Sequence, residues 1–133
     1  MIELKPAVRA LLDGANFGHM ATLMASGAPQ VSAIWLDTDG TYLLINTADG
    51  RTKTNNVRRD PRVAISVVDQ GNAYREVMIR GRVVEILSEG ADEHIDALAK
   101  KNLGQDRYPF RQPGERRLIL KIEPDAVSGM NLD

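Results

Sequence analysis

Stretches rich in β-branched and aromatic residues alternate with short turn sequences along most of the chain. The turns contain Gly, Pro, Asp or Asn, which are the residues that tight connections between strands favour. This pattern predicts six strands, at residues 17–24, 30–36, 41–46, 62–68, 74–87 and 116–123. Pro124 is expected to end the last of them, and Gly81 to bend or bulge the longest. Because short turns join most of the strands, antiparallel pairing is expected.

Helical periodicity replaces this pattern in three segments, at residues 6–14, 50–59 and 89–103. Pro6 suits the first turn of the first helix, and Pro61 lies just past the end of the second. Ser88 is a suitable N-cap for the third helix, which Gly104 stops. Together the elements predict a mainly β fold with attached helices, a six-stranded antiparallel barrel. We expect it to form a single domain spanning residues 1–133.

The composition is that of an ordinary soluble protein, with 43% hydrophobic and 26% charged residues among 133. A net charge of −1 argues against a large nucleic-acid footprint. The absence of cysteine excludes disulfides, thiolate metal sites and cysteine nucleophiles. The first residues lack the order of a signal peptide, and no apolar run is long enough to cross a bilayer. These features predict a cytoplasmic protein without a membrane partner.

Residues 47–61 hold the most informative chemistry in the chain. Arg51, Lys53, Arg58 and Arg59 crowd one short predicted helix, whose start also carries threonine hydroxyls. The free N–H groups and positive dipole end of a helix N-terminus favour a phosphate, and adjacent cations strengthen that grip. A solvated basic helix face has the same pattern, so spacing alone leaves both interpretations open.

Other candidate residues are less informative. His19 and His94 have no second ligand at metal-site spacing, so no metal site is expected. Acidic residues on the third helix are better explained by pairing with Lys100 and Lys101 than by a catalytic carboxylate pair. Trp35 suits core or dimer packing as well as contact with a planar ligand. The sequence Tyr-Pro-Phe at residues 108–110 suits either a pocket wall or a packed loop.

The order of these elements and their motifs resembles the pyridoxamine 5′-phosphate oxidase-like split β-barrel superfamily. The similarity is greater to its F420 (deazaflavin)-dependent oxidoreductase branch, and it covers nearly the whole chain. Five motifs carry it: residues 20–23 (Met-Ala-Thr-Leu), 27–32 (Gly-Ala-Pro-Gln-Val-Ser), 51–63 (Arg-Thr-Lys-Thr-Asn-Asn-Val-Arg-Arg-Asp-Pro-Arg-Val), 79–83 (Ile-Arg-Gly-Arg-Val) and 108–109 (Tyr-Pro). The basic residues that bind pyridoxal phosphate in the oxidases are not recognisable in residues 127–132. Pyridoxamine phosphate oxidation is therefore not expected.

The resemblance implies a homodimer with cofactor sites in the grooves between its subunits. Carried over by position, Arg51 and Lys53 are the phosphate-binding pair. The full set of cofactor contacts expected is Pro29, Val31, Ser32, Ala33, Trp35, Thr47, Arg51, Thr52, Lys53, Asn56, Ile79 and Arg80. No catalytic residue is assigned, because in this chemistry the protein supplies orientation and electrostatics.

The implied function is an F420-dependent oxidoreductase that passes a hydride from the reduced deazaflavin to a small electron-poor or conjugated acceptor. Two alternatives stay open. One is an FMN-dependent oxidoreductase of the same fold, and the other is a protein that binds or sequesters the cofactor without turnover. Phosphate recognition does not separate these three, because both cofactors carry a ribityl phosphate.

Overall fold

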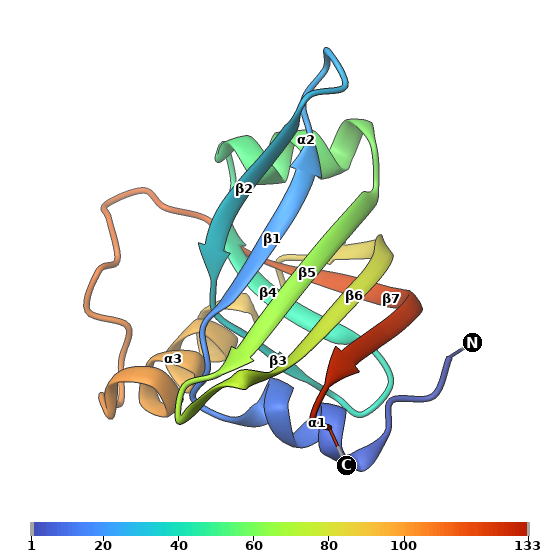
Figure 1. Ribbon diagram of the computed structural model, residues 1–133. Coiled ribbons are helices and arrows are strands. Elements are labelled where there is room, and N and C mark those ends of the chain that lie inside the picture. Colours follow the sequence, from blue (N-terminus) through green and yellow to red (C-terminus); the bar gives the residue numbers. More distant parts are fainter. Residues whose placement is uncertain (1, 133) are drawn as a thin grey trace.

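The computed structural model describes residues 2–132, so residues 1 and 133 of the expected domain lie outside it. Strands make up most of the described chain, and the helices lie at its ends or between strands (Figure 1). In chain order the elements are α1 (Pro6–Asp13), β1 (Gly18–Leu23), β2 (Pro29–Ile34), β3 (Leu36–Thr38), β4 (Leu43–Ala48), α2 (Thr52–Arg59), β5 (Arg62–Asp69), β6 (Asn72–Leu87), α3 (Ala91–Leu103) and β7 (Arg117–Met130).

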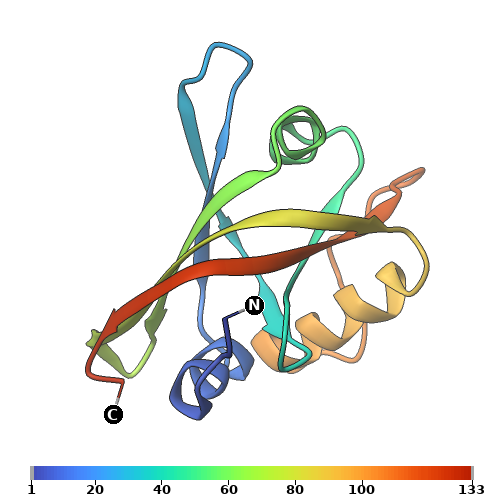
Figure 2. The same ribbon diagram turned by 90° about the vertical axis from the view of Figure 1, so that its right-hand side faces the viewer.

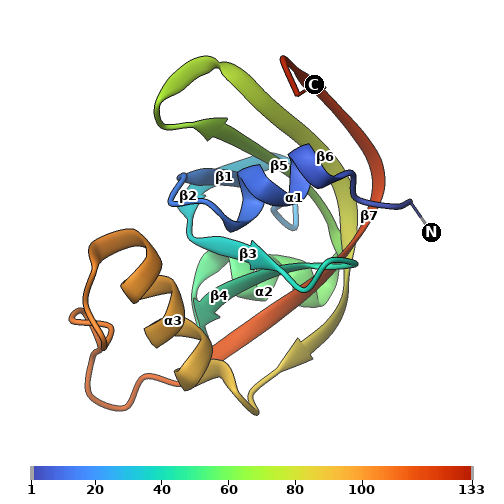
Figure 3. The same ribbon diagram turned by 90° about the horizontal axis from the view of Figure 1, so that it is seen from below.

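The strands of the described chain form one antiparallel sheet in the order β2-β1-β5-β6-β7-β4-β3. The sheet curls into a half-barrel, which confirms the expectation of a mainly β, antiparallel barrel-like fold (Figures 1 and 3). Its hairpins, β1 with β2, β5 with β6 and β3 with β4, pair strands that follow one another in sequence. Strands β6 and β7 pair over most of their length and carry the curvature.

The expected strand at residues 30–36 is divided, which changes the strand count from six to seven within the described residues. Trp35 separates β2, which pairs with β1, from β3, which pairs with β4. These two strands occupy opposite edges of the sheet. Ile34 and Leu36 are both buried on either side of the break. The hydrophobic run looks continuous in sequence because the division depends on which distant strand each half contacts.

The expectation that Pro124 ends the last strand is wrong, because β7 continues to Met130. Strand β4 pairs with β7 only as far as Ile122, so beyond that point β6 is the sole neighbour of β7 in the described chain. A proline is tolerated where one edge of a strand needs no hydrogen bond. Pro124 lies opposite Gly81, and the register of β6 shifts between Arg80 and Gly81. The bulge expected at Gly81 is therefore confirmed.

The core fills the concave side of the sheet, and two helices close its ends (Figures 2 and 3). Helix α1 buries Val8, Leu11 and Leu12, the face expected from its periodicity. Helix α2 packs against β1 and buries Val57. Helix α3 lies outside the half-barrel against β4 and β7. None of the helices in residues 2–132 has the length and apolar character needed to span a membrane.

The start of α3 differs from the expected one. The residue before its first turn is Gly90, in the left-handed region at φ 79°, and no side chain in the described residues caps the helix. Ser88 is therefore not the N-cap; its carbonyl instead accepts a hydrogen bond from the N–H of Ala91. The other end is as expected, because Gly104 ends α3 with φ 71°.

Gly81→Ala should lower the free energy of unfolding by about 1–3 kcal/mol, the cost of overpacking a site that cannot expand. A Cβ at this position would overlap the carbonyl oxygen of Glu123 on β7. Urea denaturation measures the change. Gly71→Ala is the matched control, since its Cβ would meet only the flexible Asp69 carboxylate at 3.4 Å. The control should stay within about 0.5 kcal/mol; equal stabilities of the two variants would contradict the β6–β7 register.

Candidate functional site

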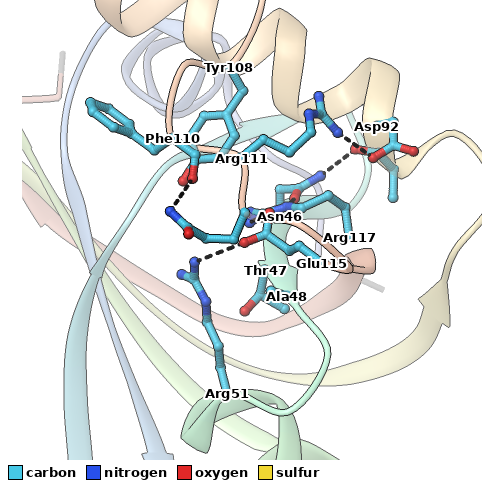
Figure 4. A network of polar contacts seen from close by, with 12 residues as sticks. Asn46, Thr47, Ala48, Arg51, Asp92, Tyr108, Phe110, Arg111, Glu115 and Arg117 are labelled. Carbon is cyan, nitrogen blue, oxygen red and sulfur yellow. Dashed lines mark hydrogen bonds and ion pairs between the residues drawn. The ribbon is translucent and has the colours of Figure 1, made fainter.

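An open cavity of about 170 Å³ lies where the start of α2 faces α3 and the loop between α3 and β7. Its walls combine aromatic, aliphatic and cationic side chains from β2, β4, β7, both of these helices and the loop. The lining residues are Phe17, Ala33, Ile34, Trp35, Asn46, Arg51, Lys53, Ile95, Tyr108, Phe110 and Arg117. Figure 4 shows part of this wall, with Arg51 pointing from α2 toward Glu115 and Arg117.

Lys53 is the most unusual cation of the cavity. Only 8% of it is exposed, and its Nζ donates a hydrogen bond to Oγ of Ser32 at 3.1 Å. No carboxylate of residues 2–132 forms an ion pair with it. Burial lowers the pKa of Lys53, and the nearby positive charges of Arg51 and Arg117 lower it further. The ammonium group of Lys53 is thus buried without a carboxylate partner among residues 2–132.

Arg117 is nearly inaccessible, with 2% of its side chain exposed. Its Nε donates to Oδ1 of Asn46 at 2.8 Å, and its Nη1 donates to Oε1 of Glu115 at 2.9 Å. The guanidinium also lies 5.1 Å from the centre of the Tyr108 ring, within range of a cation–π interaction. These contacts hold Arg117 in one orientation at the cavity wall (Figure 4).

The charges around the cavity do not balance. Arg51, Lys53 and Arg117 supply three positive charges, and Glu115 is the only described carboxylate within ion-pair distance of any of them. Its distance to Arg51 is 3.9 Å, and Arg51 remains about half exposed. In addition, within the described part of the chain no side chain caps the N-terminus of α2. The surplus of positive charge and free N–H groups suits an anion such as a phosphate group.

Three aromatic rings form the opposite wall. Trp35 and Tyr108 meet edge to face at 5.9 Å, and Tyr108 meets Phe110 in the same way at 5.7 Å. Arg111 anchors their loop to α3 through Asp92 at 2.7 Å and Asp96 at 2.9 Å.

The expected pairing of these two carboxylates with Lys100 and Lys101 on the same helix is wrong. Lys100 pairs with Asp106 at 3.6 Å, and Lys101 donates to the carbonyl oxygens of Leu12 and Leu36. The acidic face of α3 instead serves to hold the aromatic loop.

The structure brings some of the expected cofactor residues together. Four of them line the cavity: Ala33, Trp35, Arg51 and Lys53. Ser32 does not line it, but its hydroxyl accepts a hydrogen bond from Lys53. The expected basic segment therefore does face a hollow, and only part of it is solvated surface.

Two other expected residues, Thr47 and Asn56, are buried among protein atoms. The Oγ1 of Thr47 lies 3.2 Å from that of Thr54, and Nδ2 of Asn56 donates to Oγ1 of Thr22 at 2.9 Å. Both side chains hold α2 against the sheet and do not line the cavity. Thr52 is exposed in the first turn of α2.

The remaining expected residues lie elsewhere on the sheet. Pro29, Val31 and Arg80 line two shallow hollows on its convex face, one of about 670 Å³ and one of about 540 Å³. Ile79 is 1% exposed and its side chain belongs to the core, so the Ile79 side chain offers a ligand almost no surface. Whether these positions contact a cofactor stays a prediction.

Sequence reasoning missed several residues of the cavity, namely Phe17, Ile34, Asn46, Ile95 and Arg117. It also missed Glu115, which pairs with Arg51 and Arg117 beside the cavity. Asn46 carried a weak signal, because it is a polar residue at the end of an apolar stretch. Arg117 carried another, as a charged residue at the start of a strand whose next residues are apolar. No metal-binding group of three His, Asp or Glu side chains is found in residues 2–132.

Comparisons with known proteins agree with this architecture. The family model described as pyridoxamine 5′-phosphate oxidase matches residues 4–131. A solved structure of an F420 reductase is 32% identical, with a TM-score of 0.79, covering 90% of this chain and 94% of that chain.

Two further solved structures share the fold at lower identity. A conserved hypothetical protein from Mycobacterium tuberculosis is 21% identical, with a TM-score of 0.75 over 99% of this chain and 87% of its own. A putative pyridoxamine 5′-phosphate oxidase from Listeria innocua is 20% identical, with a TM-score of 0.65 over 92% and 94%.

Lys53→Met should raise the thermal unfolding midpoint of the ligand-free protein by about 2–5 °C, the shift that roughly 1 kcal/mol gives in a domain of this size. The reason is that the fold lowers the pKa of Lys53, so its charged form destabilises the folded state. The penalty is fully present below the lowered pKa and disappears as pH rises to the ordinary value of 10.5.

Calorimetry at neutral and at alkaline pH measures this difference. The difference in unfolding midpoint between Lys53→Met and the wild type should shrink as the pH rises. Lys100→Met, at a lysine whose side chain is 73% exposed, is the matched control and should leave the midpoint unchanged. A midpoint that falls in Lys53→Met would mean that Lys53 stabilises the fold and is not held there against its stability.

Proposed function

The chain belongs to the pyridoxamine 5′-phosphate oxidase family, and from that premise we propose that it is an F420-dependent oxidoreductase. Its acceptor is a small electron-poor or conjugated molecule. When bound, F420 supplies the hydride that such an acceptor takes up, and the protein supplies binding and orientation. The similarity to an F420 reductase, at 32% identity over most of both chains, supports this choice within the family.

The observation that carries the proposal is the buried ammonium group of Lys53. A lysine this inaccessible is ordinarily paired with a carboxylate, and in residues 2–132 it has only the Ser32 hydroxyl. With Arg51 and Arg117 beside it, the cavity holds an excess of positive charge. The phosphate of a deazaflavin or a flavin brings negative charge and acceptor oxygens to this set of donors.

The two walls of the cavity have different roles in this proposal. Arg51 and Lys53, together with the free N–H groups of α2, bind the phosphate and fix the position of the cofactor. Trp35, Tyr108 and Phe110 present ring surfaces that exclude water from the space next to the cations. Arg117, fixed by Asn46 and Glu115, adds a donor whose direction is set before any ligand arrives.

We also propose that two copies associate through the convex face of the sheet. Several outward-facing positions of β1, β2, β5 and β6 are small or apolar, among them Ala21, Ala64, Val31 at 65% exposure and Met78 at 45%, with Arg62 and Arg80 beside them. Exposed apolar residues grouped on one sheet face are typical of an interface between subunits. A second copy there would bring Arg80 and the hollow around it close to the partner subunit.

Ala64→Arg should convert the dimer to a monomer, because it places a further charge in the middle of this face, on β5, which lies between β1 and β6. Sedimentation equilibrium measures the mass of the 14.6 kDa chain and its assemblies. Gln70→Arg, at an exposed position in the turn between β5 and β6, is the control that should leave the dimer intact. A wild-type protein that sediments as a monomer at all concentrations would contradict the proposed interface.

The purified protein should bind F420 at least about tenfold more tightly than FMN, a difference of about 1.4 kcal/mol. Fluorescence titration with each cofactor measures both affinities. A protein that carries FMN through purification, or prefers FMN in the titration, would replace the proposal by an FMN-dependent oxidoreductase. Tight F420 binding with no hydride transfer to any of a panel of quinones, conjugated lactones and tetrapyrroles would favour a binding protein without turnover.

The same titration with Lys53→Met tests the phosphate grip. Loss of a charge-assisted hydrogen bond should weaken F420 binding by about 1.5–3 kcal/mol, roughly 10- to 100-fold. Lys100→Met should bind as the wild type does. Undiminished binding by Lys53→Met would show that the cavity described here is not the cofactor site.

A further inference from the structure

A chain of buried and partly buried hydrogen bonds runs from the surface behind α3 to the cavity. Oδ1 of Asp37 on β3 lies 2.8 Å from Nε2 of His94 on α3. Nδ1 of His94 lies 3.1 Å from Nδ2 of Asn46 on β4. Oδ1 of Asn46 in turn accepts the hydrogen bond from Nε of Arg117 on β7. The Asn46 side chain therefore connects a histidine outside the half-barrel, itself bonded to Asp37, with the buried arginine of the cavity wall.

The chemistry of Arg117 fixes the direction of every bond in this chain. A guanidinium group only donates hydrogen bonds, so the oxygen of the Asn46 amide must face Arg117. The amide nitrogen then faces the other way, where it donates to the carbonyl of Ala91 at 2.8 Å and toward Nδ1 of His94. Nδ1 must therefore accept and carry no proton. The proton of the neutral imidazole is on Nε2, from which it is donated to Asp37.

The surroundings of His94 leave this arrangement little freedom. Only 9% of the His94 side chain is exposed. The charged groups around it come from several elements: Asp37 from β3, Arg117 from β7 acting through Asn46, Lys101 from α3 itself, and Asp13 from α1 near Lys101. Burial lowers the pKa of Lys101, whereas the two carboxylates oppose that shift. Asp37 alone contacts the imidazole with a charge.

We propose that His94 is a positioning residue that controls Arg117 through Asn46. In its neutral form it accepts from the Asn46 amide and so keeps the amide oxygen turned toward Arg117. In its protonated form both ring nitrogens donate, and Nδ1–H would point at the N–H groups of Asn46. Turning the amide around would bring its nitrogen against Nε of Arg117 and its oxygen against the carbonyl of Ala91. Either outcome breaks the chain, and the turned amide releases Nε of Arg117.

The release of Arg117 has a consequence at the aromatic wall. The Tyr108 ring lies under the guanidinium and against Trp35, so a displaced Arg117 changes the environment of that tryptophan. Trp35 is the only tryptophan of the chain, and its fluorescence therefore reports on this wall alone. The link to the cofactor rests on the proposed function, whereas the link to Trp35 does not.

Nitrogen-15 NMR of the histidine side chains in the ligand-free protein tests the first step. At neutral pH, Nδ1 of His94 should give the signal of an unprotonated nitrogen and Nε2 that of a protonated one. The chain has two histidines, and His19→Gln assigns the signals by removing the other, which is exposed on β1. A proton on Nδ1 of His94 at neutral pH would overturn the proposal.

Tryptophan fluorescence between about pH 8 and about pH 5, the range in which histidine takes up a proton, tests the second step. The wild type should show a single transition, which His94→Gln abolishes because the amide does not titrate there. Asp37→Asn is a milder change; loss of the carboxylate disfavours the imidazolium and should move the transition to lower pH. Identical transitions in the wild type and His94→Gln would overturn the proposal, as would an unmoved transition in Asp37→Asn.

Titration with F420 at both ends of that pH range completes the test. Wild-type affinity should fall about three- to tenfold at the acidic end, the loss expected for one hydrogen-bonded donor. The affinity of His94→Gln for F420 should fall much less over the same pH range. A pH-independent wild-type affinity alongside the expected NMR and fluorescence results would overturn the functional part of the proposal. If F420 does not bind at all, the proposed function fails, and the control of Arg117 by His94 stands on the other two measurements.

Discussion

A single residue, Trp35, joins the two strands that lie at opposite edges of the sheet. Strand β2 ends at Ile34 and pairs with β1, whereas β3 begins at Leu36 and pairs with β4. The sheet must therefore curl until its two edges approach each other, and the register shifts in β6 and β7 allow it to do so. The curl creates both the concave core and the corner at which Trp35 faces the cations of α2.

Local chemistry was enough to predict the elements but not all of their limits. Turns and helix ends depend on residues within a few positions of one another, so the locations of the helices and of most strands can be predicted from the sequence. The break at Trp35 and the continuation of β7 through Pro124 depend instead on which strand lies alongside. A proline that interrupts a central strand is harmless where one neighbour has already ended. That information comes from distant parts of the chain.

The candidate site divides in the same way. Arg51 and Lys53 were predictable because a basic helix start is visible in sequence and matches a family motif. Asn46 and Arg117, 71 positions apart, become partners only when β4 and β7 pair. Thr47 and Asn56 show the limit of local reasoning, since hydroxyl and amide groups near a helix start suit a phosphate and a protein partner equally well. Here they satisfy the protein's own polar groups instead.

The aromatic loop and the cations of the cavity belong to different parts of the chain. Tyr108 and Phe110 reach the cavity from a segment without regular structure, which Arg111 ties to α3 by ion pairs. Lys53 belongs to α2, which is packed on the sheet, and Arg51 directly precedes this helix. Insertions or exchanges in the loop can therefore alter the shape of the entrance while the charges opposite remain in place. The fold thus contains one segment that can diversify in sequence without rebuilding the part of the cavity that carries the charge.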